Sequence, residues 1–466
     1  MTLDALFAGQ RRAAQEQPTP TAAQRRDALT RLLRLVHDRR QPLADAVNQD
    51  FGHRSRHEFL ITEVYTTLKA IRHSRRHVGR WMRARRVPVS LELLPARARV
   101  MVQPRGVVGI ISPWNYPLYL SFVPLAAALA AGNRVLLKPS EHTPRTAALM
   151  AELLAGAFKE AQVAVVTGAA DVGRAFTALP FDHLLYTGST EVGREVMRAA
   201  AGQLTPVTLE LGGKSPAIVG CSANLRNAAR SIMTGKLINA GQTCIAPDYV
   251  LLPEPACEAF VRHAREAVAA LYPDLHNNAD YTAIVNGSYY ARLQAHLADA
   301  RAKGARAVAL AAEAPEGGAA RRLTPHLLLE VSDSMSVMQE EIFGPLLPLV
   351  PYREIDEAIA YVNARPRPLA LYYFGRDRAE QRRVLGRTVS GGVTVNDTLF
   401  HIAVDDLPFG GVGASGMGAY HGRAGFDTFS VLKPVFYQSP VNGGVLLRPP
   451  FGWFTEALVR LLIGRR

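Results

Sequence analysis

The sequence predicts an α/β protein with two open sheet domains and a small β arm. The first indication is length, because 466 residues exceed what one hydrophobic core usually holds. The second is that short apolar runs alternate with helix-like segments, as in parallel sheets with helical crossovers. The third is that this alternation occurs in two series along the chain. Two α/β units in tandem are therefore the simplest arrangement.

A helical region comes first, over about residues 21–86. Leu29, Leu32, Leu33 and Val36 recur at the spacing of one helix face, and arginines occupy the other face. We expect this region to form the helical entry to the first domain.

The first series then supplies short buried strands, separated by helix-like segments such as 143–158. These strands are GVVGII (106–111), RVLLK (134–138), VAVV (163–166) and HLLY (183–186). The second series begins at VTLELGG (207–213). Its further elements are PAIVG, a helix over 223–239, YVLLP, a helix over 254–271, ALYYFG (370–375) and GGVTVN (391–396).

Two segments interrupt this alternation. Residues 81–103 are rich in arginine, leucine and β-branched residues, and a glycine-rich stretch with alternating apolar residues follows position 400. We expect both to be strands that leave their domain to join a partner subunit.

The composition, 48% hydrophobic and 20% charged, is typical of a soluble globular protein. The net charge of +14 reflects an arginine-rich, alanine-rich bias, and no basic run is interleaved with aromatic residues, so we expect no nucleic-acid partner. Three cysteines favour a reducing compartment. The opening MTLDALFAGQRR lacks the pattern of a secretory signal, which predicts a cytoplasmic protein.

Several strand ends carry residues suited to binding a nucleotide. In YTGSTEVG (186–193), Gly188 and Ser189 end an apolar strand and a helix follows Gly193, so backbone N–H groups there attract phosphates. An ordinary strand-to-helix turn is the alternative, because the motif is not G-x-G-x-x-G. Lys138 and Glu141 in LLKPSE follow another strand, where a lysine donates to ribose hydroxyls and a glutamate accepts from them.

Three other positions are candidates for chemistry. In ISPWNYP, the Asn115 amide is held beside a proline turn and could donate to an oxyanion, or could simply cap the turn. In VTLELGGKSP, burial would raise the pKa of Glu210 toward that of a general base, unless Glu210 faces solvent. Cys244 in AGQTCIAPDYV is a nucleophile if local donors favour its thiolate, and otherwise an inert thiol. EEIFGP offers Glu341 and Phe343, with a surface acidic pair as the alternative.

The order of these motifs resembles the aldehyde dehydrogenase superfamily over about residues 20–437. The motifs are N-x-P, K-P-S-E, G-S-T-E-V-G, E-L-G-G-K, G-Q-T-C, E-E-I-F-G-P and P-F-G-G, with 34 residues between Glu210 and Cys244. NAGQTCIAPDYV is similar to the class 3 branch, which includes fatty and aromatic aldehyde enzymes. Residues 395–422 are similar to bacterial coniferyl aldehyde dehydrogenases.

The resemblance implies a role for each catalytic position. Cys244 would attack the aldehyde carbonyl, and the Asn115 amide with the Cys244 N–H would hold the oxyanion. Hydride would pass to a nicotinamide, and Glu210 would help water to hydrolyse the resulting thioester to a carboxylic acid.

The resemblance also implies NAD as the cofactor, with NADP as an alternative, and no metal. Lys138 and Glu141 would hold the adenine ribose, Ser189 the pyrophosphate, and Glu341 with Phe343 the nicotinamide riboside. The other implied cofactor-binding residues are Trp114, Gly188, Gly193 and Leu211.

The implied fold has two Rossmann-type open α/β domains and a small β oligomerisation arm, assembled as a homodimer. The expected divisions are an NAD(P)-binding domain (1–80 and 104–208), a catalytic domain (209–399), the arm (81–103 and 400–440) and a tail with an amphipathic helix (441–466).

The tail ends FGWFTEALVRLLIGRR, whose sixteen residues include Glu456 and Arg460. It is shorter than the roughly twenty apolar residues that cross a bilayer. It could lie on a membrane surface, shield the substrate mouth, or dock against its own dimer.

The 395–422 similarity favours aromatic aldehydes, with medium- or long-chain fatty aldehydes as the alternative. A catalytically silent binding or structural relative would be expected to lack Cys244, Glu210 or Asn115. A coenzyme A-acylating relative would be expected to lack Glu210, so its presence favours hydrolysis.

Overall fold

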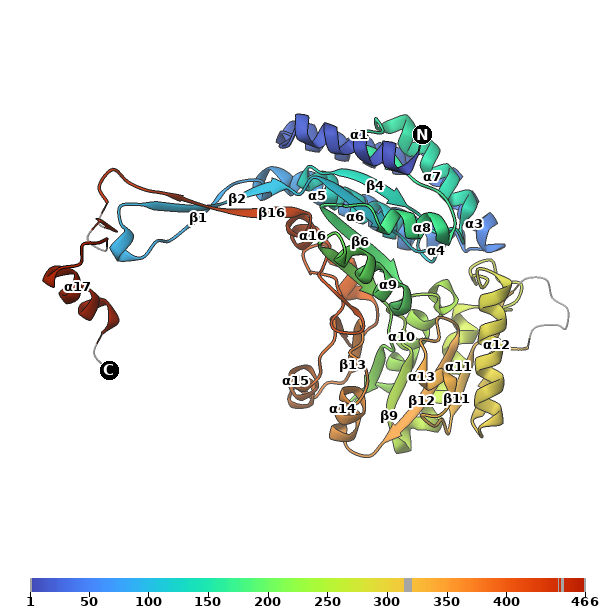
Figure 1. Cartoon of the computed structure of the whole chain (residues 1–466). Helices are drawn as coiled ribbons and strands as arrows, with labels where there is room; N and C mark the ends of the chain where they lie inside the picture. The colour runs from blue at the N-terminus through green and yellow to red at the C-terminus, as the bar shows by residue number, and fades with distance from the viewer. Residues whose placement is uncertain (1, 314–320, 443, 446–447, 465–466) are drawn as a thin grey trace.

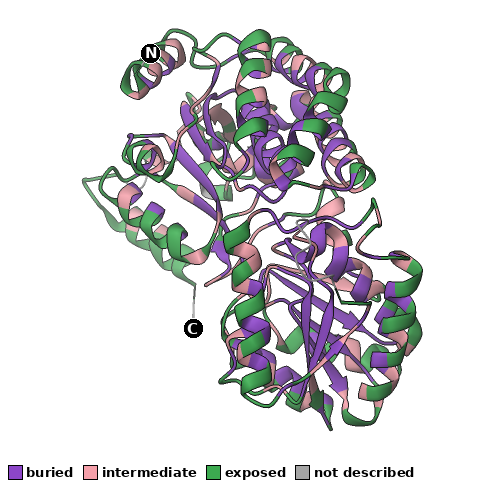
Figure 2. Ribbon diagram, turned by 90° about the vertical axis from the view of Figure 1, so that its right-hand side faces the viewer, coloured by how far each residue is buried: buried purple, intermediate pink, exposed green. Residues whose placement is uncertain are grey.

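The computed structural model describes residues 2–313, 321–442, 444–445 and 448–464. The strands among these residues form three sheets: two lie in separate α/β lobes, and the third is a long ribbon that extends away from both (Figure 1). In both lobes the strands are buried and the helices that flank them turn their exposed faces to solvent (Figure 2). The tandem α/β arrangement predicted from the sequence is confirmed.

The first lobe contains a six-stranded sheet in the order β15-β7-β6-β3-β4-β5, parallel except for β15. Its strands are β3 (Val107–Ile111), β4 (Arg134–Lys138), β5 (Val163–Val165), β6 (His183–Gly188), β7 (Val207–Leu211) and β15 (Gly416–Met417). The carboxyl ends of the parallel strands therefore meet at one edge, where ligands bind in open α/β sheets.

Helices cover both faces of this sheet. They are α1 (Leu3–Glu16), α2 (Ala22–Asp38), α3 (Arg40–Phe51), α4 (Arg56–Phe59), η1 (Leu60–Tyr65), α5 (Thr66–Trp81), α6 (Tyr119–Ala131), α7 (Pro144–Ala157), α8 (Ala170–Thr177), α9 (Thr190–Ala201) and α16 (Gly422–Thr428). Thr21 and Gln24 form a reciprocal capping box that fixes the start of α2. Gly52 takes a left-handed conformation (φ 75°) that ends α3, so the predicted helical region is divided into several helices.

Helix α6 is the central helix of this lobe, with all its residues buried. At its amino end Glu63 accepts hydrogen bonds from the N–H groups of Leu118 (2.8 Å) and Tyr119 (3.4 Å). At its carboxyl end the buried Arg25 donates to the carbonyls of Ala130 (3.0 Å) and Ala131 (2.7 Å). A negative charge at the start and a positive charge at the end both complement the helix dipole.

The second lobe contains a seven-stranded sheet in the order β10-β11-β12-β9-β8-β13-β14, parallel except for β10. Its strands are β8 (Pro216–Val219), β9 (Tyr249–Pro253), β10 (Arg306–Ala309), β11 (His326–Leu329), β12 (Leu346–Tyr352), β13 (Ala370–Phe374) and β14 (Gly392–Val395). Its helices are α10 (Leu225–Leu237), η3 (Ile238–Gly241), η4 (Glu254–Ala256), α11 (Cys257–Leu271), α12 (Gly287–Ala302), α13 (Ser336–Gln339), α14 (Ile355–Asn363), α15 (Arg378–Arg387) and η5 (Phe400–Ala403).

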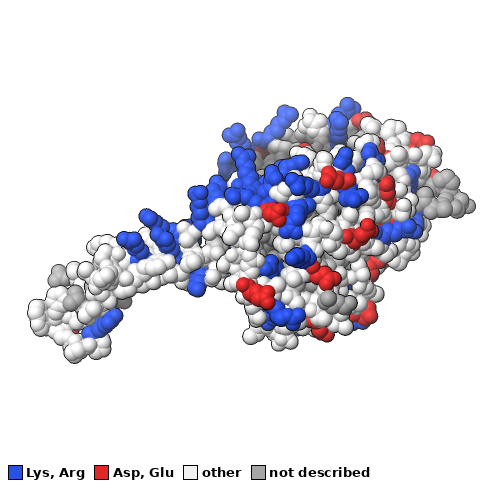
Figure 3. Space-filling model, turned by 90° about the horizontal axis from the view of Figure 1, so that it is seen from above, with Lys and Arg blue, Asp and Glu red and all other residues white. Residues whose placement is uncertain are grey.

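The ribbon is an antiparallel sheet of β1 (Arg85–Val87), β2 (Arg97–Pro104) and β16 (Ser430–Tyr437), with the short helix η2 (Leu91–Leu93) between its first two strands. Basic side chains follow it and the adjoining surface of the first lobe (Figure 3). Beyond it lies α17 (Trp453–Ile463), as predicted, and none of its residues is buried. Among the described residues, no helix has both the length and the apolar character needed to cross a membrane.

The sheet pairing corrects two predicted boundaries. Strand β7 pairs with β6, so the predicted start of the second domain at residue 209 falls inside a strand of the first sheet. Within 400–440, only β16 joins the ribbon, whereas β15 pairs with β7 and α16 packs on α5 and α6. The physical reason is that an apolar run predicts a strand but does not say which sheet supplies its hydrogen-bonding partner.

Candidate active site

Cys244 lies in the loop between η3 and β9, and an unusual turn places it there. Asn239, Ala240 and Gly241 have φ angles of 53°, 50° and 78°, so the backbone is left-handed at three successive residues. A Cβ atom at Gly241 would lie 2.4 Å from the carbonyl oxygen of Gly344, so only glycine fits. The turn leaves the thiol partly exposed and packed against the core. Local strain of this kind is common at functional sites.

Asn115 comes from the loop between β3 and α6 and contacts the Cys244 loop directly. Its side-chain Nδ2 donates to the carbonyl of Gln242 at 3.1 Å. The hydroxyls of Tyr116 and Thr243 are hydrogen-bonded at 2.7 Å. Two contacts thus join the first lobe to the residues immediately before Cys244.

Glu210 lies near the end of β7 with 2% of its surface exposed, so the solvent-facing alternative is wrong. Neither of its carboxyl oxygens has a hydrogen-bond partner, and burial raises its pKa well above the ordinary range. The negative charge of Glu210 also contributes to the raised pKa of the Cys244 thiol.

The electrostatics of Cys244 differ from the sequence-based expectation. Burial raises the pKa of its thiol to about 12, and the charges of Glu341 and Glu210 add to this effect, although the backbone N–H groups of Cys244 and Ile245 oppose it. Without substrate or cofactor, the sulfur is therefore a protonated thiol at neutral pH, and the local donors expected to activate it are outweighed.

Glu341 approaches the end of β7 from the second lobe. A Cβ atom at Gly212 would lie 1.9 Å from a Glu341 carboxyl oxygen, and the backbone of Gly213 hydrogen-bonds to that carboxyl group. Burial, with the charge of Asp248, raises the pKa of Glu341 to about 8. The alternative that the two glutamates form an acidic pair on the surface therefore does not hold, because Glu340 is exposed whereas Glu341 is half-buried against the end of β7.

Charged side chains fix the loop 340–343 that carries Glu341 and Phe343. Lys214 donates to the carbonyl of Glu340 at 3.0 Å, and Arg292 donates to those of Glu341 (3.1 Å) and Ile342 (2.7 Å). Asp248 pairs with Lys214 and accepts the N–H of Ile342 at 3.1 Å. The sequence reasoning missed all three charges. Lys214 and Asp248 lie within the quoted motifs but were given no role, and Arg292 lies outside the motifs, where a single charge resembles a solvated surface.

The predicted nucleotide-binding residues lie at the carboxyl edge of the first sheet. Lys138, at the end of β4, is buried and lies 3.3 Å from the Glu141 carboxylate. Ser189 caps α9 by accepting the N–H of Val192 at 3.4 Å. This helix start follows β6, and the lysine–glutamate pair follows β4, two strands away at the same edge of the sheet, an arrangement that fits a dinucleotide.

Small residues allow close packing beside this edge. A Cβ atom at Gly193 would lie 2.6 Å from the Leu211 side chain, so glycine brings α9 close to β7. A Cβ atom at Gly188 would meet the Tyr186 hydroxyl at 2.2 Å. Trp114 contacts Phe343 edge-on at 5.5 Å between ring centres, which joins the two lobes at the same edge.

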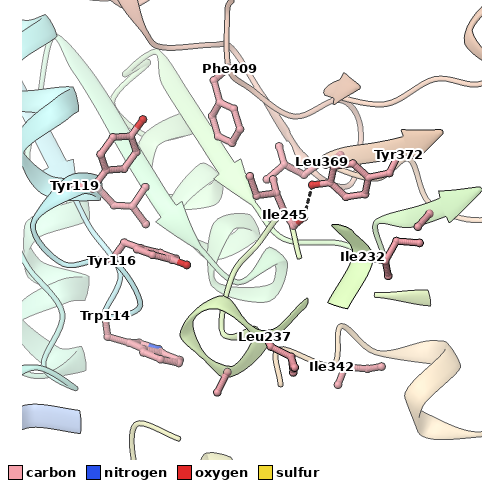
Figure 4. Close-up of a cluster of buried hydrophobic side chains, with 14 of the residues drawn as sticks. Trp114, Tyr116, Tyr119, Ile232, Leu237, Ile245, Ile342, Leu369, Tyr372 and Phe409 are labelled. Carbon is pink, nitrogen blue, oxygen red and sulfur yellow. Dashed lines mark hydrogen bonds between the residues drawn. The ribbon is translucent and has the colours of Figure 1, made fainter. Parts of the chain in front are cut away.

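Aromatic side chains surround the Cys244 loop. Figure 4 shows Trp114, Tyr116 and Tyr119 on one side of Ile245 and Tyr372 on the other, with Phe409 above. The Tyr372 hydroxyl donates to the Ile245 carbonyl. These rings come from distant segments, so no local motif in the sequence identified them as a group.

The fold and the site together define a cysteine-dependent, nucleotide-using oxidoreductase, because a thiol, an amide and an unpartnered carboxyl converge beside a dinucleotide-binding edge. Comparison with known families makes this specific: the chain belongs to the aldehyde dehydrogenase family, whose model matches residues 2–435. The protein is an aldehyde dehydrogenase that uses NAD(P).

Individual relatives agree with this assignment. The chain is 55% identical over 463 residues to a "Probable coniferyl aldehyde dehydrogenase" of Pseudomonas aeruginosa, covering 99% of this chain and 96% of that one. It is 43% identical over 407 residues to "Aldehyde dehydrogenase family 3 member A2" of Mus musculus, covering 87% and 82%. The solved structure "Substrate bound state of Staphylococcus Aureus AldH" superposes with a TM-score of 0.94 at 36% identity, covering 100% of both chains.

Proposed function

We propose that this enzyme oxidises aromatic aldehydes, coniferyl-type aldehydes among them, to carboxylic acids through a thioester on Cys244. One observation carries the mechanism: the buried Glu210 carboxyl has no hydrogen-bond partner, and its charge contributes to the raised pKa of the Cys244 thiol. A carboxyl group buried at such cost serves proton transfer better than it serves stability.

The reaction begins when the Cys244 thiol releases its proton to water and the sulfur attacks the aldehyde carbon. A C–S bond forms, and the carbonyl π electrons move to oxygen. The Asn115 Nδ2 has two N–H bonds and uses one on Gln242, so the other can donate to this oxyanion together with the Cys244 N–H. Bound NAD(P) would accept the hydride that leaves the aldehyde carbon, so that the C–H bond breaks, the C=O bond re-forms and a thioester remains on Cys244.

Hydrolysis follows at Glu210. Its carboxylate takes a proton from water, the oxygen attacks the thioester carbonyl, and the C–S bond breaks to release the acid and the Cys244 sulfur. The raised pKa of Glu210 makes this carboxylate a stronger base than an exposed glutamate.

The cofactor would be held along the carboxyl edge of the first sheet. Lys138 and Glu141 would bind the adenine ribose, and Ser189 at the start of α9 the pyrophosphate. Glu341 and Phe343, fixed by the loop 340–343, would bind the nicotinamide riboside. The other residues predicted to contact the cofactor are Trp114, Gly188, Gly193 and Leu211. The carboxylate of Glu141 would repel a 2′-phosphate, which favours NAD over NADP.

Two observations support the aromatic substrate. The rings of Tyr119, Tyr372 and Phe409 face the Cys244 loop, and flat aromatic partners prefer stacked or edge-on contacts with such rings. Three curated relatives, at 50–55% identity, are named as coniferyl or probable coniferyl aldehyde dehydrogenases.

The test follows reduced-cofactor absorbance with coniferaldehyde, benzaldehyde and saturated aldehydes of increasing chain length, each with NAD and NADP. We expect the highest kcat/KM for the aromatic aldehydes. Cys244→Ala should abolish turnover, a loss of at least about 10⁴-fold. Full turnover by that variant would refute the covalent mechanism, and a preference for long-chain aldehydes would replace the substrate assignment.

We also propose that the enzyme is a cytoplasmic homodimer. The ribbon exposes Met101, Val431, Leu432 and Phe436, whose apolar side chains would be covered by a second copy. In this assignment, the first lobe binds the cofactor, the second lobe carries the Cys244 loop, and the ribbon is the oligomerisation arm. Light scattering of the purified enzyme would measure the assembly, and a monomer would contradict it.

We also propose that helix α17, whose residues are exposed or half-buried, contacts a membrane surface. Trp453 and Leu461 are 82% and 77% exposed, beside the charges of Glu456 and Arg460. Pelleting the full chain and a chain ending at residue 450 with liposomes tests this contact. Equal pelleting of the two chains would exclude it.

A further inference from the structure

Arg54 is a buried arginine for which the reaction has no direct use. It lies in the short connection between α3 and α4, with only 2% of its surface exposed. Its guanidinium carbon lies 5.0 Å from the ring centre of Phe51 and 5.1 Å from that of Tyr116. Burying a guanidinium is costly unless acceptors meet its N–H groups, so its partners indicate what it holds in place.

The two partners of Arg54 are the backbone of the turn that carries Asn115 and the Glu63 carboxylate, which binds the far end of that turn. Arg54 Nη1 donates to the backbone carbonyl of Asn115 at 2.9 Å, and its Nη2 lies 3.5 Å from a carboxylate oxygen of Glu63. The second oxygen of Glu63 accepts the N–H of Leu118 at 2.8 Å. One buried ion pair therefore holds both ends of the turn 115–118.

A second donor converges on the same carbonyl. Asn239 Nδ2 donates to the Asn115 oxygen at 3.0 Å, and the Asn239 N–H is itself anchored on Glu58 at 3.0 Å. With two donors on one carbonyl, the peptide plane after Asn115 is fixed. The direction in which the Asn115 side chain leaves the backbone is then fixed as well.

We infer that Arg54 is a positioning residue, which holds Asn115 so that its amide meets the oxyanion developing beside Cys244. This inference rests on the oxyanion role of Asn115 in the proposed function. Arg54 does not touch the reacting atoms and acts only through the Asn115 backbone. A displacement of about 1 Å at such a donor can cost about 100-fold in rate.

The experiment substitutes Arg54→Lys in the full-length enzyme. Lysine keeps a positive charge near Glu63 but lacks the planar guanidinium that donates to the Asn115 carbonyl through one nitrogen while a second nitrogen pairs with Glu63. We expect kcat to fall about 10- to 100-fold, with KM for aldehyde and cofactor changed less than about threefold. Rates are compared only between variants whose thermal unfolding midpoint matches that of the unaltered enzyme, so that misfolded protein does not account for a loss of kcat.

Arg25→Lys is the matched control. Arg25 is also a buried arginine, with 3% exposure, and it donates to carbonyls at the opposite end of α6. A loss of kcat in Arg54→Lys alone supports positioning, whereas equal losses in both variants would indicate a general effect on stability and overturn the inference.

A double-mutant cycle with Asn115→Ala tests the route of the effect. If Arg54 acts through Asn115, Arg54→Lys should lower kcat no further in the Asn115→Ala background. An equal loss in both backgrounds overturns the inference. If Asn115→Ala alone keeps normal kcat, the oxyanion role fails and the inference falls with it. A loss in Asn115→Ala with none in Arg54→Lys refutes only the positioning role.

Glu63→Gln provides a second variant if Arg54→Lys does not fold. It keeps an oxygen for the Leu118 N–H but removes the charge that orients Arg54. We expect Glu63→Gln to lower kcat, by less than Arg54→Lys does, and to leave KM for aldehyde and cofactor nearly unchanged. An unchanged kcat would count against the inference.

Discussion

The two sides of Cys244 are built in opposite ways. On the amide side, Asn115 has two donors on its carbonyl and a hydrogen bond from its side chain, so its position is fixed. On the carboxyl side, neither oxygen of Glu210 has a hydrogen-bond partner. A group that stabilises charge must be held still, whereas a group that accepts and releases protons must stay free of competing donors.

Removing the free carboxyl should have the largest effect. Glu210→Gln should lower steady-state turnover about 10²- to 10⁴-fold, because the thioester is no longer hydrolysed efficiently. The first turnover should survive, since the amide side is intact. Stopped-flow absorbance would then show a burst of reduced cofactor followed by slow turnover. Loss of the burst would mean that Glu210 also serves the first half of the reaction.

Removing the fixed amide should have the next largest effect. Asn115→Ala should lower kcat about 10²- to 10³-fold, because one oxyanion donor is lost. The same loss should appear in hydrolysis of a nitrophenyl ester without cofactor, since that reaction also passes through an oxyanion on Cys244. An ester rate equal to that of the unaltered enzyme would place Asn115 outside the oxyanion site.

Loosening the loop 340–343 should affect the cofactor alone. Arg292→Lys weakens the hold on the carbonyls of Glu341 and Ile342, which should raise KM for NAD about 10-fold. Cofactor-free ester hydrolysis is the internal control and should not change. A parallel loss of ester hydrolysis would show that the loop also shapes the thiol site.

The smallest effect concerns the pH dependence of the thiol. The negative charge of Glu341 raises the pKa of Cys244, and Glu341 is ionised above its own pKa of about 8. Glu341→Gln should therefore move the alkylation of Cys244 to lower pH than the value of about 12. Peptide-resolved alkylation rates between pH 8 and 12 would measure this shift, with exposed Cys221 as the internal control. A shift to higher pH would contradict the sign of the interaction.

Local pattern was enough to predict most of the strands. GVVGII, RVLLK and HLLY became β3, β4 and β6, because buried parallel strands are continuous apolar runs. The pairing of β15 with β7 was not predictable, because it joins residues far apart in sequence. The motif residues were predicted from the sequence, and the hydrogen bond from Asn115 to Gln242 and the effect of the Glu210 charge on the Cys244 thiol support the roles proposed for them.

The supporting charges were not found from the sequence. Arg25, Arg54 and Glu63 all lie in the helical region where the pattern placed arginines on the solvent face, yet all three are buried. Periodicity separates apolar from polar residues, but it cannot tell a solvated charge from one that binds helix ends or turns inside the protein. The raised pKa of Cys244 was missed for a related reason, since it depends first on burial in the folded protein and then on carboxylates from other segments.

The short strand β15 has a consequence for the order of folding. Gly416 lies opposite Glu210 in the sheet, and a Cβ atom there would lie 2.0 Å from the Leu209 carbonyl, so the strand edge that carries Glu210 is closed by a segment that follows the second lobe in sequence. During synthesis β7 therefore stays an open edge until the chain of the second lobe has been made. Open edges of this kind can pair with other chains, so β15 also protects the first sheet.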